Sequence, residues 1–209
     1  MALKRALTLQ NVMDADVKTF DFAGEWLDAF GKPQATGVWL VYGGSGSGKT
    51  TFVMMLIKYL AAFGRVLFVS YEEGLSSASL KVTIDRLGLM ERQNEVLVTI
   101  DSVEELDERL RKQRSPDIVV IDSLELSEFN TVRQIKMFAD KYPQKLFIYI
   151  GQADGDKPRS ELGKAVLFLA NQKIYVEGYR AFTRGRSQGE KDAFITIWAE
   201  RGDKYWEYK

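Results

Sequence analysis

The chain has 209 residues, 45% of them apolar, which is enough for one globular domain with a sizeable core. It contains neither cysteine nor histidine, so disulfides, thiolate chemistry and the usual transition-metal sites are not expected. The formal net charge is zero, so any binding to nucleic acid must come from a local patch and not from a global field.

Residues 1–36 are expected to form a lead-in to a single domain that covers residues 1–209. Residues 1–17 show no sustained periodicity, and residues 25–30 form a short amphipathic segment that Gly31 ends. The start of the chain lacks the charged and then apolar pattern of a secretion leader, and no apolar run is long enough to span a bilayer. We therefore expect a cytoplasmic protein without a membrane partner.

Residues 43–50 read GGSGSGKT and match the P-loop, a glycine-rich turn that binds phosphates. An apolar run over 38–42 precedes them and a helix-length apolar run over 51–63 follows, which is the strand–loop–helix context that the motif needs. Glycines let backbone N–H groups point at anionic oxygens, Lys49 supplies charge for the β- and γ-phosphates of ATP, and Thr50 offers a hydroxyl to Mg²⁺. The predicted nucleotide-binding residues are Gly43, Gly44, Ser45, Gly46, Ser47, Gly48, Lys49, Thr50 and Thr51.

Strand and helix patterns alternate after the P-loop, which predicts an α/β fold with a mostly parallel sheet flanked by helices. The predicted strands cover residues 65–70, 96–100, 117–122 and 145–150, and the predicted helices cover 75–87, 102–114, 131–142 and 162–171. Residues 172–209 change character. Strand patterns at 173–176, 179–184, 193–199 and 204–208 predict an antiparallel extension of the sheet.

Acidic residues follow two of the predicted parallel strands, where ligands bind in such folds. Asp122 ends an apolar strand in the Walker B pattern, so we expect Asp122 and Thr50 to hold Mg²⁺ from opposite sides. The alternative is a simple strand-capping aspartate. Glu72 and Glu73 end the strand after the P-loop helix, where a carboxylate can activate the attacking water. For this pair the alternative is a solvated acidic turn.

Two further polar groups are candidates. Gln152 ends the last predicted parallel strand, where an amide can hydrogen-bond the γ-phosphate, although it can also be only a polar residue closing a strand. Arg184 and Arg186 lie far along the chain from the P-loop, so their guanidinium groups are expected to serve the phosphates of a neighbouring subunit. A surface hairpin with incidental charges is the alternative.

With these residues in place, the chain resembles the RecA-like ATPases, within them the single-core branch around RadA/Sms and KaiC, and more distantly the DnaB-type helicases. The resemblance covers roughly residues 18–200. It is carried by the P-loop with Thr51, the strand ending in Glu72 and Glu73, the strand ending in Asp122, the Gln152 exit, and Arg184-Gly185-Arg186, which is similar to a Lys-x-Arg finger.

The resemblance implies that Glu72, and less readily Glu73, activates water, that Gln152 senses the γ-phosphate, and that Arg184 and Arg186 act in trans within a ring or filament. The chain departs from its relatives in several ways. It has Arg at the first finger position, where Lys is common, and lacks the RadA zinc module, the protease-like domain and the second ATPase repeat of KaiC. A core of this size resembles minimal recombinases or annealing proteins of phages and mobile elements.

Two functions of different classes follow. The first is a DNA-dependent ATPase that assembles on single-stranded DNA in recombination, repair or annealing. The loop 124–130 is acidic, so only Lys157, Arg159 and Lys164 offer contacts to DNA phosphates. The second is a KaiC-like regulatory or scaffold ATPase whose nucleotide state is read by a protein partner. A small-molecule kinase is disfavoured because the chain has no arginine-rich lid and carries a glutamate placed to activate water.

Overall fold

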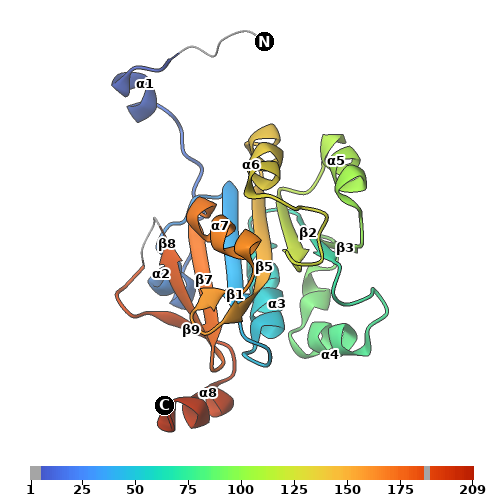
Figure 1. Cartoon of the computed structure of the whole chain (residues 1–209), viewed down its shortest axis with the longest axis vertical. Helices are drawn as coiled ribbons and strands as arrows, with labels where there is room; N and C mark the ends of the chain where they lie inside the picture. Colours follow the sequence, from blue (N-terminus) through green and yellow to red (C-terminus); the bar gives the residue numbers. More distant parts are fainter. Residues whose placement is uncertain (1–5, 186–188) are drawn as a thin grey trace.

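The computed structural model describes residues 6–185 and 189–209 and shows a twisted central sheet with helices on both faces (Figure 1). The sheet has nine strands in the order β3-β2-β4-β5-β1-β7-β8-β9, with β6 paired to β5 beside this path. The strands are β1 (Gly37–Gly43), β2 (Val66–Ser70), β3 (Val96–Thr99), β4 (Ile118–Asp122), β5 (Leu146–Asp154), β6 (Lys157–Pro158), β7 (Gln172–Glu177), β8 (Arg180–Gly185) and β9 (Phe194–Thr196).

The helices are α1 (Leu9–Met13), α2 (Glu25–Phe30), α3 (Lys49–Leu60), α4 (Ala78–Arg86), α5 (Val103–Arg111), α6 (Val132–Lys141), α7 (Glu161–Leu169) and α8 (Ala199–Glu207), with a short 3-10 helix at Leu89–Arg92. Capping boxes start α5 and α6: Ser102 with Glu105, and Thr131 with Gln134. No helix in the described part of the chain is long and apolar enough to cross a membrane.

The sheet is parallel from β3 to β7, which confirms the predicted α/β class. Helices α3 and α4 cover one face, and α5, α6 and α7 cover the other, so the central strands are buried on both sides. Leu67 and Phe68 show the result, since neighbouring residues of one strand belong to opposite core clusters. The carboxyl ends of the parallel strands therefore meet along one edge of a rigid layer.

The lead-in is packed onto the domain through aromatic residues. Helix α2 forms over the predicted residues and places Trp26 in a stack on Tyr59 of α3, with ring centroids 4.5 Å apart. Phe22 contacts the same Tyr59 ring edge-on at 5.0 Å. In contrast, α1 buries none of its residues and projects from the domain (Figure 1).

The C-terminal region differs from the sequence prediction in three ways. Strand β7 is parallel to β1, so only β8 and β9 are antiparallel. The predicted strand over 204–208 is wrong, because these residues belong to helix α8. Gly202, Tyr205 and Trp206 have helical spacing, and they cover the β7–β8 turn, where the Trp206 indole donates to the Gly178 carbonyl at 3.1 Å. Finally, the predicted loop over 153–161 contains β6, which pairs with the end of β5.

Candidate functional site

The P-loop connects β1 to α3 and needs glycine at three of its four glycine positions. Gly46 and Gly48 have φ angles of 73° and 96°, which side chains disfavour. A Cβ on Gly43 would meet the Val176 carbonyl of β7 and approach the Ser47 hydroxyl to 2.9 Å. A Cβ on Gly44 would meet no atom of the protein within 4 Å, so only a ligand could require glycine there.

The chemistry of this loop fits a phosphate group. Helix α3 begins at Lys49, and its N-cap Gly48 supplies no side-chain hydrogen bond, so the first N–H groups of a 12-residue helix remain available to an anion. The Ser47 hydroxyl is buried and has no hydrogen-bond partner among the described residues. Exposed Ser45 and half-buried Thr50 complete the loop surface. Thr51 differs from the other predicted contacts, because its hydroxyl already accepts a hydrogen bond from Arg86 at 3.0 Å.

Asp122 is the last residue of β4, level with Ser70 of β2 and Ile150 of β5. Its side chain is buried, and the peptide bond to Ser123 is cis. Burial raises the pKa of Asp122 to about 7, the nearby Glu72 contributes to the rise, and Lys49 opposes the shift. A buried carboxylate among acidic neighbours is a favourable ligand for a hard cation, so Asp122 fits the predicted Mg²⁺ position opposite Thr50.

Glu72 and Glu73 follow β2 and have different surroundings. The Glu73 carboxylate accepts a hydrogen bond from Ser77 at 2.8 Å, and the Glu73 carbonyl accepts one from Ser70 at 2.5 Å. Glu72 is exposed, and no hydrogen bond or ion pair holds its carboxylate within the described residues. Glu72 also affects the pKa of Asp122 more strongly than Glu73 does. The geometry therefore favours Glu72 as the carboxylate free to contact a ligand.

Gln152 lies beside the P-loop, because it is the register partner of Gly43 across β5 and β1. Its backbone N–H donates to Glu125 at 3.1 Å, and Glu125 also accepts from the Ser160 hydroxyl at 3.2 Å. In the sequence, Glu125 is only one residue of an acidic loop. Its role as an acceptor that ties this loop to the Gln152 exit requires the fold to bring residues 27 positions apart together.

Arg184 is not placed near its own P-loop. It pairs with Lys173 of β7, which is level with Leu40 in the middle of β1. Two strand spacings and three residues of strand separate Arg184 from the level of Gly43, about 10 Å in each direction. Its side chain is exposed. The other predicted finger residue, Arg186, lies outside the described residues.

The predicted DNA contacts lie on the β5–β6 hairpin and on α7. Lys157 and Arg159 are exposed on the hairpin, which the Tyr175 hydroxyl fixes by donating to the Gly155 carbonyl at 2.9 Å. Lys164 is exposed on α7 and forms an ion pair with Glu161 at 2.7 Å. Its charge is therefore partly neutralised, whereas the two hairpin residues form no ion pair within the described part of the chain.

The C-terminal region also contributes residues to the P-loop surroundings that the sequence did not reveal. The Tyr179 N–H donates to the Ser47 carbonyl at 3.1 Å, and the Tyr179 ring would lie 3.1 Å from a Cβ on Gly48. Trp198 lies under two guanidinium groups, with Arg86 at 5.3 Å and Arg201 at 4.2 Å from its ring centroid. Their only sequence signal was aromatic residues interleaved with arginines.

No protein-family model and no curated protein matches the sequence, whereas solved structures share its fold. The flagellar accessory protein FlaH from Methanocaldococcus jannaschii superposes with a TM-score of 0.58 at 13% identity, covering 86% of this chain and 93% of FlaH. The ATPase domain of a phage helicase superposes with a TM-score of 0.56 at 15% identity, covering 80% of this chain and 84% of that domain. The chain therefore has the RecA-like P-loop fold.

Proposed function

We propose that this protein binds and hydrolyses ATP with Mg²⁺. The observation that carries the proposal is the junction of two strand exits: the Tyr71 and Glu72 N–H groups both donate to the Asp122 carbonyl, at 2.5 and 3.2 Å. A free carboxylate and a buried carboxylate are thereby fixed at the same sheet edge as a phosphate-binding loop.

Each residue then has a distinct role. Backbone N–H groups of the P-loop and the Lys49 ammonium bind the β- and γ-phosphates, while Thr50 and Asp122 hold the metal ion. Bound Mg²⁺ neutralises phosphate charge and orients the terminal phosphate. Glu72 accepts a proton as water forms a bond to the γ-phosphorus, and the bond to the leaving ADP oxygen breaks. Gln152, beside Gly43, is suited to sense whether the γ-phosphate is present.

We also propose that the protein acts as an oligomer on single-stranded DNA in recombination, repair or annealing. The position of Arg184, far from its own P-loop, supports an arginine that completes the site of a neighbouring subunit. Lys157 and Arg159, exposed on one tied hairpin, form a small cationic surface suited to phosphate contacts.

A second candidate is a KaiC-like regulatory or scaffold ATPase without DNA binding. The loop after β4 favours it, since Glu125 and Glu128 turn this loop toward internal bonds: Glu125 binds the Gln152 exit, and Glu128 accepts the Val103 N–H at 2.9 Å. An acidic loop near the nucleotide repels DNA. The name of FlaH, a flagellar accessory protein, is also compatible with a role other than DNA binding.

A salt titration of ATP hydrolysis distinguishes the two candidates. Single-stranded DNA should stimulate wild-type turnover at low salt, and the stimulation should fall as salt rises, because phosphate contacts release counterions. The Lys157→Ala/Arg159→Ala variant should keep basal turnover and lose the stimulation. The matched control, Lys136→Ala/Lys141→Ala, removes the same charge from α6 and should retain it. A wild type that hydrolyses ATP but ignores DNA at every salt concentration supports the regulatory candidate.

A further inference from the structure

Tyr71 stands directly before Glu72 at the exit of β2. Its backbone N–H and that of Glu72 share one acceptor, the Asp122 carbonyl. The backbone that carries Glu72 is therefore fixed to the Walker B strand on one side. Because the Glu72 carboxylate has no bond of its own among the described residues, its position depends on how firmly this backbone is held.

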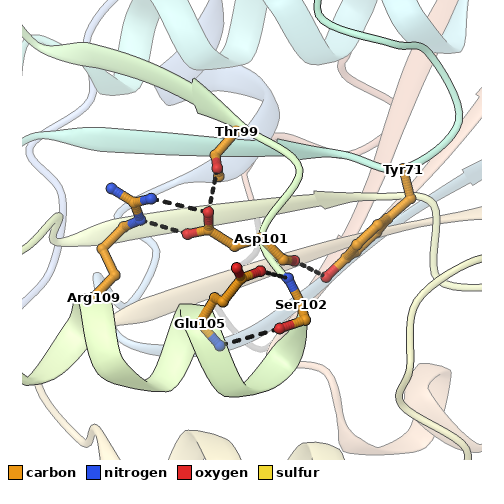
Figure 2. Close-up of polar contacts among 6 residues, drawn as sticks. All are labelled: Tyr71, Thr99, Asp101, Ser102, Glu105 and Arg109. Carbon is orange, nitrogen blue, oxygen red and sulfur yellow. Dashed lines mark hydrogen bonds and ion pairs between the residues drawn. The ribbon is translucent and has the colours of Figure 1, made fainter.

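The Tyr71 side chain supplies a second attachment on the opposite side. Its hydroxyl donates to the Asp101 carbonyl at 2.5 Å, joining the exit of β2 to the segment after β3 (Figure 2). Burial raises the pKa of Tyr71 to about 12, so the hydroxyl remains a donor throughout the neutral range.

Asp101 is itself firmly held. The residue is only 8% exposed, and its carboxylate accepts a hydrogen bond from the Thr99 hydroxyl and is bound by two nitrogens of Arg109, with Nη2 at 2.9 Å from Oδ1 (Figure 2). The hydrogen bond from Arg109 lowers the pKa of Asp101, so the ion pair persists at neutral pH. Arg109 lies on α5, whose first turn is closed by the Ser102–Glu105 capping box.

We propose that Tyr71 is a positioning residue for Glu72, acting through its hydroxyl bond to Asp101. This inference rests on the proposed ATP hydrolysis. The three strand exits of β2, β3 and β4 form one hydrogen-bonded unit with Tyr71 at its centre, and that unit sets the backbone from which the Glu72 carboxylate reaches water. Displacing a catalytic group by about 1 Å costs on the order of 10²-fold in rate, so loss of one anchoring bond has a measurable effect.

The first test is the Tyr71→Phe variant, which removes one oxygen atom and keeps the ring. We expect kcat to fall by roughly 10- to 100-fold while the dissociation constant for Mg-ADP changes less than about twofold. The matched control is Tyr142→Phe, because the half-buried Tyr142 also donates to a carbonyl, that of Asp107 at 3.0 Å, but lies at the opposite end of the sheet. Tyr142→Phe should leave kcat unchanged even where thermal unfolding shows a similar loss of stability.

A double-mutant cycle separates positioning from a general structural effect. In a Glu72→Gln background the water-activating carboxylate is gone, so adding Tyr71→Phe should lower single-turnover hydrolysis by less than about twofold. An equal loss of rate in both backgrounds, or normal kcat in Tyr71→Phe alone, overturns this proposal while leaving the proposed function intact. Absence of ATP hydrolysis in the wild type overturns the proposed function, and the role of Tyr71 with it.

Discussion

Two regions flank the P-loop, and they contribute to the site in different ways. On one side, parallel strands β2, β4 and β5 end in polar residues that follow apolar runs, as Asp122 does. On the other side, β7, β8 and α8 bring the aromatic residues Tyr179 and Trp198 to the loop. The first region supplies carboxylates and an amide, and the second supplies aromatic surface and guanidinium groups.

The difference teaches where chemistry and where surroundings come from in this fold. A carboxylate needed at a strand exit is placed by the strand itself, so one substitution there should remove a chemical step. The aromatic residues reach the P-loop through a turn in which Gly178 and Tyr179 have φ angles of 51° and 58°. Substitutions in that region should therefore change affinity or assembly more than the chemical step.

The largest effect is expected for Lys49→Ala at the start of α3. Removing the ammonium leaves the β- and γ-phosphates without their main compensating charge, so hydrolysis should be abolished and ATP binding strongly weakened. Steady-state phosphate release and calorimetry with Mg-ATP check the two effects. Unchanged turnover would mean that the P-loop assignment is wrong.

The arginine pair in and after β8 should act between subunits. A Lys49→Ala chain that retains its arginines should rescue an Arg186→Ala chain with an intact P-loop when the two are mixed, and wild-type specific activity should rise more than proportionally with protein concentration. An arginine that contacts transition-state charge is worth on the order of 10³-fold in rate, so rescue should stand well above background. Activity independent of concentration, with no rescue, rules out an arginine finger in trans.

A smaller effect, on affinity, is expected for Trp198→Ala. The change removes the ring on which Arg86 and Arg201 lie, and with it an aromatic surface beside the P-loop helix. Such contacts are worth about 1–2 kcal/mol, so the dissociation constant for Mg-ADP should rise roughly tenfold while kcat at saturating ATP is kept. Phe168→Ala, an 81% exposed residue on α7, is the control. Equal affinities in the two variants would limit the site to the parallel strands.

The smallest effect concerns the stability of the ligand-free protein. Because burial raises the pKa of Asp122 to about 7, its protonated form favours the folded state, and this contribution is complete below the unfolded pKa of about 4. It is lost as pH rises through about 7. In buffer without divalent cations, the free energy of unfolding should thus fall more between pH 6 and pH 8 for wild type than for Asp122→Asn. Identical pH slopes would contradict the burial of this carboxylate.

Sequence patterns predict the parts of the site that are continuous in the chain. The glycine spacing and the apolar runs around it are enough to place β1, the P-loop and α3, and Asp122 follows from the same kind of pattern. Contacts between distant segments have no such signature. The bonds of Glu125 to Gln152 and of Tyr71 to Asp101 depend on strand order, and α8 differs from its prediction because alternating aromatic residues also fit a strand.

The central claim is that Glu72, fixed beside Asp122, activates water for attack on ATP bound at the P-loop. Single-turnover hydrolysis with protein in excess, measured together with Mg-ATP affinity, tests it most directly in wild type, Glu72→Gln and Glu73→Gln. The account predicts unchanged ATP affinity and loss of hydrolysis in Glu72→Gln, because the carboxylate acts only in the transition state. It predicts a smaller loss in Glu73→Gln, whose carboxylate binds Ser77. Normal hydrolysis in Glu72→Gln, or loss of hydrolysis confined to Glu73→Gln, would contradict it.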